Sequence, residues 1–141
     1  MHKIVSLATI PNQVSDKIDP NLYDYQKILN RYVVALGTTT ESLVKKHGKD
    51  LVHQQLLVKR LADIAIDLFV GYCVISRASL LLKKNPNNTQ VLNIVKISIH
   101  EAKRRMRSNL RRIEKNEDRA VGELSNFLVN SNGYPWDAFF E

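Results

Sequence analysis

One long apolar stretch, residues 55–79, constrains the fold of this chain more than any other feature. Over residues 61–75 nearly every position is apolar, and the acidic exceptions are Asp63 and Asp67. A helix that is apolar all round lies inside a helical bundle or crosses a membrane. The two aspartates and Arg77 argue against a membrane span, because unpaired charges are costly in lipid. The stretch therefore predicts the central helix of a soluble bundle.

Three further helical patterns and short turn-forming segments make up most of the remaining sequence. Apolar residues recur at helical spacing in each pattern. The predicted helices run from Asp19 and Pro20 to His47, from Leu51 to Lys84 and from Asn88 or Thr89 to Ile113. A last predicted helix carries the apolar residues from Val121 to Val129 and stops near Asn132 and Gly133. The predicted turns lie at Gly48–Asp50, Asn85–Asn88 and Asn116–Asp118. Short connections join antiparallel neighbours, so the sequence predicts an all-α, up-down-up-down four-helix bundle.

Two flanking segments are set apart from this bundle, which is assigned residues 20–133. Residues 1–19 mix short apolar patches with Pro11 and Asp16, and are predicted to be a linker. Residues 134–141 are dense in aromatic side chains and form a predicted C-terminal tail. Two interpretations of this tail stay open: it folds back on the bundle, or it protrudes as a docking peptide or interfacial anchor.

The chain offers little for metal or redox chemistry. Its single cysteine, Cys73, lies in the apolar stretch and is expected to be a buried, small hydrophobic residue. None of the four histidines has a second histidine three or four residues away, and no second cysteine is present. We therefore expect no metal site.

Charged side chains on the central helix are candidates for structural ion pairs. Asp63 and Asp67 share a helix face with Lys59 and Arg60, and Arg77 follows further along the same helix. Paired carboxylates can also perform acid–base catalysis, but no cleft is implied here, so ion pairs that serve the fold are preferred. If Asp63 is deeply buried, its loss should cost ~3 kcal/mol or more.

Positive charge is concentrated in residues 103–115 of a chain whose net charge is +7. Such a charge indicates an anionic partner: a lipid surface, nucleic acid or an acidic protein. The residues expected on one outward face are Arg104, Arg105, Arg107, Arg111, Arg112 and Lys115. A solvated helix end, anionic lipid and an acidic protein segment all remain open. Nucleic acid is disfavoured, because no aromatic residues alternate with the arginines.

Several separated blocks of the sequence resemble the C-terminal helical bundle of acyl-CoA dehydrogenases. Gly48 and Lys49, Gln55, Leu61–Asp63 and Arg77–Ser79 keep the spacing of that family without a gap. The blocks at 46–52, 59–63, 65–68 and 75–79 are most similar to one branch. This branch comprises the very-long-chain enzyme and its relative that assists assembly of respiratory complex I, and it carries an additional, vestigial C-terminal bundle. The resemblance runs from about Asp19 to about Arg107.

The resemblance implies a bundle without catalytic or cofactor-binding residues. Val44 stands where catalytic bundles carry an arginine that reaches the flavin phosphates, and a valine has no donor for a phosphate. Glu114, Glu117 and Glu123 lie in an ordinary charged region instead of a catalytic loop. We therefore expect this chain to be no enzyme and to bind no cofactor, whereas a full-length parent would resemble an FAD-dependent acyl-CoA dehydrogenase.

The preferred function is a non-catalytic protein-binding or assembly module of mitochondria, in the matrix or at the inner-membrane face. The resemblance implies a catalytic dehydrogenase half or a complex I assembly factor as the partner. The alternatives are a C-terminal fragment of a dehydrogenase of fatty-acid β-oxidation, or a peripheral inner-membrane module. An apolar central helix, together with Tyr23, Tyr25, Tyr32 and Val34, predicts a homodimer in isolation, built on the first two helices.

Overall fold

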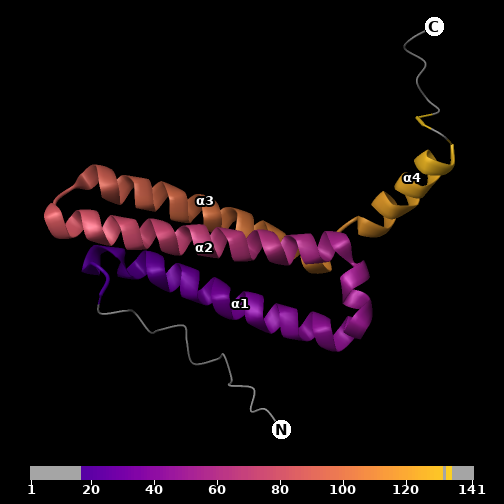
Figure 1. The fold of residues 1–141 in the computed structure, drawn as a ribbon, viewed down its shortest axis with the longest axis horizontal. Helices are drawn as coiled ribbons and strands as arrows, with labels where there is room; N and C mark the ends of the chain where they lie inside the picture. Colours follow the sequence, from indigo (N-terminus) through magenta and orange to yellow (C-terminus); the bar gives the residue numbers. More distant parts are fainter. Residues whose placement is uncertain (1–16, 132, 135–141) are drawn as a thin grey trace, which may run out of the picture.

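The computed structural model describes residues 17–131, 133 and 134, and this part of the chain is almost entirely helical. Its elements are, in order, η2 (Pro20–Leu22), α1 (Tyr23–His47), η3 (Gly48–His53), α2 (Gln55–Lys84), α3 (Thr89–Glu114) and α4 (Asp118–Asn130). In Figure 1, α1, α2 and α3 lie side by side and alternate in direction, while α4 leads away from one end. The predicted all-α helical bundle with four helices is confirmed. Residues 1–16 of the predicted linker and 135–141 of the predicted tail lie outside the described residues.

Helix ends follow from capping residues that the sequence makes visible. The Asp19 side chain accepts a hydrogen bond from the Asn21 N–H at 3.0 Å and begins η2. Gly48 has a φ of 55°, which few other residues adopt at low cost, and it ends α1. The Asn88 side chain accepts from the Val91 N–H at 3.1 Å and begins α3.

The second long helix begins at Gln55, four residues later than predicted. Residues Gly48–His53 form the 3₁₀ helix η3 in between. Leu51 in this turn packs against a small apolar cluster made of Leu43, Leu57 and Ile113. Periodicity assigned Leu51 to the helix because it is apolar, but a turn buries the same side chain equally well.

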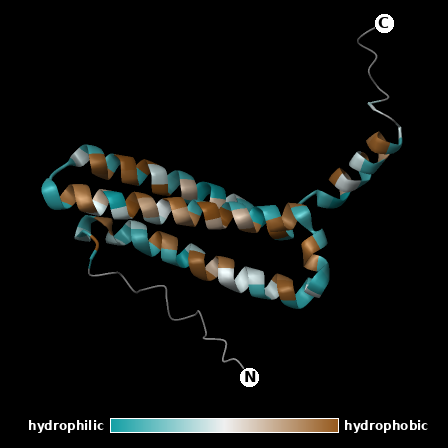
Figure 2. Cartoon of the chain, viewed as in Figure 1, coloured by the Kyte–Doolittle hydropathy of each residue, from teal (hydrophilic) through white to brown (hydrophobic). Residues whose placement is uncertain are grey.

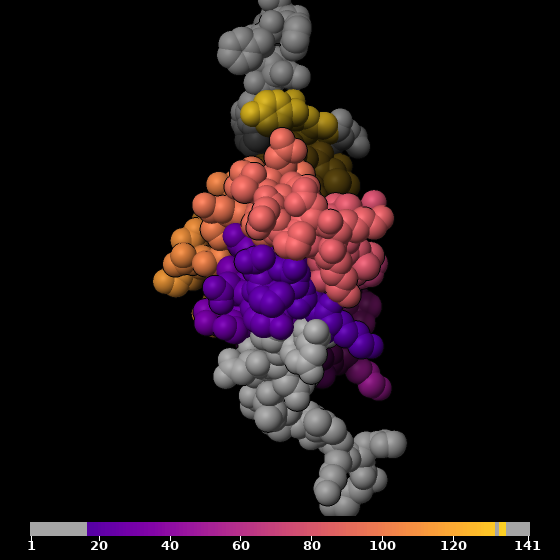
Figure 3. Space-filling view, turned by 90° about the vertical axis from the view of Figure 1, so that its left-hand side faces the viewer, coloured from indigo at the N-terminus to yellow at the C-terminus, as the bar shows by residue number. Residues whose placement is uncertain are grey.

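The main core joins α1, α2 and α3 along their length. Leu29 of α1, Ile64 of α2 and Ile99 of α3 are fully buried in it. Burial of each such side chain contributes about 1.5–3 kcal/mol. Gly71 lets α1 approach α2 closely, because a Cβ atom there would lie 2.9 Å from the Leu29 Cδ2. In the view of Figure 3, α1 packs against the hairpin that α2 and α3 form.

Two hydrogen bonds also fix α1 and the segment before it to α2. The Tyr72 hydroxyl donates to the Asn30 Oδ1 at 2.6 Å, and burial raises the pKa of Tyr72. The Asp19 N–H donates to the Ser79 hydroxyl at 2.9 Å. The bundle therefore begins slightly before residue 20, and Ile18 packs against its core.

Helix α4 is not packed into the bundle. None of its residues is buried, and Val121, Leu124, Phe127 and Val129 are all about half exposed or more. Its first residue is bonded to α2, and beyond that point α4 projects away from the other helices (Figure 1). Within the described residues, the packed body is therefore a three-helix bundle, with α4 as an amphipathic extension.

Helix α2 carries an excess of apolar surface. By length and composition it could cross a membrane, the one helix of the described residues that could. It packs on both α1 and α3. Even so, only 39% of its most apolar 18-residue window is buried inside the bundle. The other residues of that window are half-buried or exposed.

Candidate functional site

Exposed apolar side chains gather on one side of the bundle, along α2 and the first half of α3. We call this the α2/α3 apolar face and define it by Ile66, Phe69, Val70, Cys73, Leu80 and Ile94. Phe69 is 71% exposed, Ile94 60% and Ile66 59%. In Figure 2 hydrophobic colour runs along α2 and the beginning of α3, whereas the end of α3 is hydrophilic. Apolar surface of this kind marks protein or membrane contact sites.

A hollow of about 410 Å³ lies in this face, between α2 and α3. Phe69, Val70 and Cys73 line it from α2, and Ile94 lines it from α3. Arg77 is the one charged side chain among the described residues that line it. Such a lining can hold apolar side chains of a partner, but it provides no acid, base or nucleophile pair for chemistry.

The position of this face differs from two expectations. Cys73 is exposed instead of buried. The reason is that α2 is apolar all round, so apolar neighbours in sequence do not show which side meets the core. Tyr25 and Tyr32 of α1 pack partly against the core, so the exposed apolar surface is shared by α2 and α3 and not by α1 and α2.

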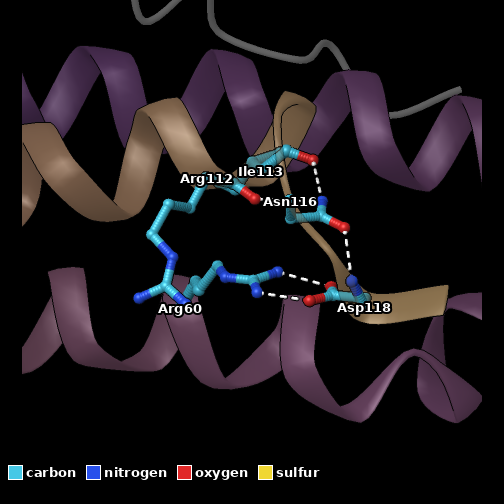
Figure 4. Close-up of polar contacts among 5 residues, drawn as sticks. All are labelled: Arg60, Arg112, Ile113, Asn116 and Asp118. Carbon is cyan, nitrogen blue, oxygen red and sulfur yellow. Dashed lines mark hydrogen bonds and ion pairs between the residues drawn. The ribbon is translucent and has the colours of Figure 1, made fainter. Parts of the chain in front are cut away.

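An ion pair between Arg60 and Asp118 connects α2 to the start of α4. The Arg60 guanidinium donates two hydrogen bonds to the Asp118 carboxylate, at 2.5 and 2.6 Å (Figure 4). The hydrogen bond to Asp118 raises the pKa of Arg60, and the bond from Arg60 holds the pKa of Asp118 below its usual value. The positive charge of Arg112 lowers the pKa of Asp118 further.

Asn116 holds the turn that places Asp118 in this position. Its amide donates to the carbonyls of Arg112 and Ile113 at 3.0 and 3.1 Å, which caps the end of α3. Its Oδ1 accepts from the Asp118 N–H at 3.1 Å (Figure 4). The end of α3, the turn and the first residue of α4 therefore form one hydrogen-bonded unit.

The other candidate ion-pair residues have different environments. Asp67 is 8% exposed and accepts from Arg105 of α3 at 2.5, 3.1 and 3.2 Å. Asp63 pairs with Lys59 of its own helix at 2.7 Å, and both side chains are more than a third exposed. Asp63 is therefore a surface charge, and Asp67 is the buried one. Arg77 forms no ion pair with another described residue.

The basic residues of α3 do not lie on one face. Arg105 points to α2, where Asp67 binds it, and Arg112 points to the Arg60–Asp118 pair. Arg107 lies near Tyr32 of α1, on another side of the helix. Arg104 pairs with Glu101. Among the described residues, Arg107, Arg111 and Lys115 remain outside ion pairs, so the predicted anionic-surface site is divided among three directions.

Val44 is half exposed near the end of α1, with no phosphate-binding donor in its side chain. The described part of the chain contains no group of three or more His, Cys, Asp or Glu side chains that could hold a metal ion.

These features define a class: an all-helical bundle with an apolar contact face and no catalytic constellation in its described residues. The sequence matches the family described as "ACAD9/ACADV, C-terminal domain" over residues 20–134, and the chain belongs to this family. It is 32% identical to the mitochondrial very long-chain specific acyl-CoA dehydrogenase of Rattus norvegicus over 126 residues, which cover 85% of this chain and 19% of that protein.

Shorter matches to the same enzyme are found in other mammals. The Bos taurus protein is 43% identical over 54 residues, which cover 38% of this chain and 8% of that protein. The Homo sapiens protein is 35% identical over 77 residues, which cover 55% of this chain and 12% of that protein. The chain thus spans less than a fifth of the length of these relatives.

Proposed function

We propose that this chain is a non-catalytic docking domain of a longer, FAD-dependent acyl-CoA dehydrogenase of the very long-chain type. The α2/α3 apolar face is the observation that carries this proposal. Leaving such a face in water costs about 25 cal/mol for each Å². Contiguous exposed apolar faces are typically covered by a partner.

The partner that fits best is the dehydrogenase portion of such a protein. The chain corresponds to 19% of the length of the rat relative, so a parent of that kind has ample surface to cover the α2/α3 apolar face. The relatives are named as mitochondrial enzymes, which supports a mitochondrial location, in the matrix or at the inner-membrane face. When the chain is isolated, a second copy takes the same surface and forms a homodimer.

The charges of this bundle serve its fold and give no support to acid–base catalysis. Asp67 is neutralised by Arg105, and Asp118 by Arg60. The hollow in the α2/α3 apolar face is lined by Arg77, Cys73 and apolar side chains. Activity toward acyl-CoA and flavin binding therefore belong to the parent protein, outside this bundle.

Two alternative partners have less support. A complex I assembly factor would use the same apolar face, and competition with the dehydrogenase portion would identify it. An anionic inner-membrane surface requires a continuous basic face. Because Arg104 and Arg105 are engaged with Glu101 and Asp67, that face is interrupted.

Sedimentation equilibrium of the 141-residue chain tests the proposal. The wild-type chain should form a dissociable dimer, and the double variant Phe69→Gln, Ile94→Gln should be a monomer. The matched control Val121→Gln, Val129→Gln changes two exposed apolar residues of α4 and should remain a dimer. A wild-type monomer at all concentrations would contradict the proposal, as would a dimer that the first variant leaves unchanged.

A further inference from the structure

A second hollow, of about 290 Å³, lies on another side of the bundle, in the groove between α1 and α3. Ile28, Arg31, Tyr32 and Ala35 line it from α1, and Lys103 lines it from α3. Its wall is therefore partly apolar and partly cationic. It shares no residue with the α2/α3 apolar face, so a ligand here would be independent of the proposed docking surface.

Two cations from two helices, Arg31 and Lys103, line this groove, and no carboxylate is among the described residues of its lining. A third cation, Arg107, lies close to Tyr32 of the same lining. Arg31 belongs to α1, and Lys103 and Arg107 follow one another by one turn on α3. Arg107 is close enough to Tyr32 for its charge to lower the pKa of that phenol, against a larger rise caused by burial. None of the three cations forms an ion pair with another described residue.

Two neighbouring cations of α3 differ from these three because each has a carboxylate partner. Arg104 pairs with Glu101 of its own helix, and Arg105 pairs with Asp67 of α2. On the side that faces α1, Arg31 and Lys103 instead line the same hollow from the two helices. A concentration of positive charge at a hollow favours the binding of an anionic ligand there.

We propose that the groove between α1 and α3 binds the phosphate group of a phosphomonoester. The guanidinium group of Arg31 presents a forked donor that matches phosphate oxygens, and Lys103 adds a second positive charge. The charge of Arg107, close to Tyr32, adds to the positive potential. The Tyr32 hydroxyl is available as a further donor. Ile28 and Ala35 contact the carbon part of the ligand. A phosphomonoester occurs both in soluble metabolites and in the headgroup of phosphatidic acid, and the experiment distinguishes these sources.

The first arm of the test uses glycerol 3-phosphate and backbone amide NMR on the full chain at constant ionic strength. Saturable shifts are expected for Tyr32, Ala35 and Lys103. Arg31→Gln and Lys103→Gln should each weaken binding about fivefold or more, because each removes a charged donor. Arg104→Gln and Arg119→Gln are the matched controls: they remove the same charge from exposed positions elsewhere. Each control should change the affinity less than twofold.

The second arm measures cosedimentation with phosphatidylcholine vesicles that contain phosphatidic acid. Binding that Arg31→Gln abolishes and Arg104→Gln preserves identifies a lipid headgroup as the source. Binding of glycerol 3-phosphate alone, with the same variant pattern, identifies a soluble ligand. The proposal is overturned if neither probe binds, or if the controls weaken binding as much as Arg31→Gln and Lys103→Gln. All four substituted residues are exposed, so the unfolding midpoint of each variant should match that of the wild type.

Discussion

Arg60 in α2 and Asp118 at the first position of α4 form a two-pronged ion pair between segments that are 58 residues apart. The Arg60 side chain is 8% exposed and the Asp118 side chain 27% exposed. Together with the hydrogen bonds of Asn116, this pair holds the first residue of α4 against α2. It also shields an arginine that would otherwise be buried without a counter-charge.

Replacing Asp118 should therefore destabilise the bundle measurably. Asp118→Ala leaves Arg60 unpaired, which should cost about 2–3 kcal/mol, slightly less than for a fully buried pair. Thermal unfolding followed by circular dichroism measures this loss. Glu123→Ala removes an exposed carboxylate that pairs with Arg119 and should cost less than about 0.5 kcal/mol. Equal losses of stability in the two variants would show that the Arg60–Asp118 pair stabilises the fold no more than an exposed ion pair does.

The same pair predicts an acid-sensitive part of the stability. The pKa of Asp118 is lowered from 3.8 in the folded chain, chiefly by its hydrogen bond from Arg60. Its contribution is therefore present in full above the unfolded-state pKa and is lost as the pH falls through the lower folded-state pKa. The stability difference between the wild type and Asp118→Asn should be constant near neutral pH and shrink in acid. A difference that stays constant throughout the acid range would contradict this assignment.

The two aspartates of α2 should differ in their effect on stability. Asp67→Ala removes a nearly buried carboxylate and leaves Arg105 unpaired, but Arg105 is 56% exposed and can be hydrated. We expect a loss of about 1–3 kcal/mol for Asp67→Ala. Asp63→Ala breaks an exposed pair within one helix and should cost about 0.5 kcal/mol or less. Urea unfolding of both variants, side by side, decides whether this order is correct.

Gly71 should be intolerant of a side chain, in contrast to Gly122. A Cβ atom at Gly71 meets the buried Leu29 side chain, whereas at Gly122 of α4 it meets nothing within 4 Å. Gly71→Ala gains about 1 kcal/mol of helix propensity but overpacks the α1–α2 contact by about 1–3 kcal/mol, so it should be neutral to destabilising. Gly122→Ala should only increase helicity. A clear stabilisation by Gly71→Ala would show that α1 can move away from α2 at little cost.

Much of this fold was predictable because its signals are local. Asn88 begins α3 through its own side chain, and Gly48 ends α1 through its own backbone conformation. Both were predicted from the sequence. The apolar residues of α3 recur at helical spacing, and Ile99 and Met106 of that series are fully buried. Such features need no knowledge of the neighbouring elements.

The unpredicted features depend on how elements meet. Helix α4 has an apolar stripe, which favoured a fourth packed helix, but its start is held by Arg60 and the rest projects away. The partner of Asp67 is Arg105 from another helix, and spacing along α2 gave no sign of it. Cys73 lies on a helix that is apolar on every side, so its exposure follows from the placement of α1 and α3.

The exposed thiol of Cys73 gives the most direct test of the docking surface. Cys73 is the single cysteine of the chain and lies within the α2/α3 apolar face. The measurement is its alkylation rate as a function of chain concentration, with the Phe69→Gln, Ile94→Gln variant as the control. If a second copy covers this face, the rate should fall as the wild-type chain associates and stay constant in the variant. A wild-type rate that is fast and independent of concentration, under conditions where the chain is dimeric, would contradict the assignment of this face as the contact surface.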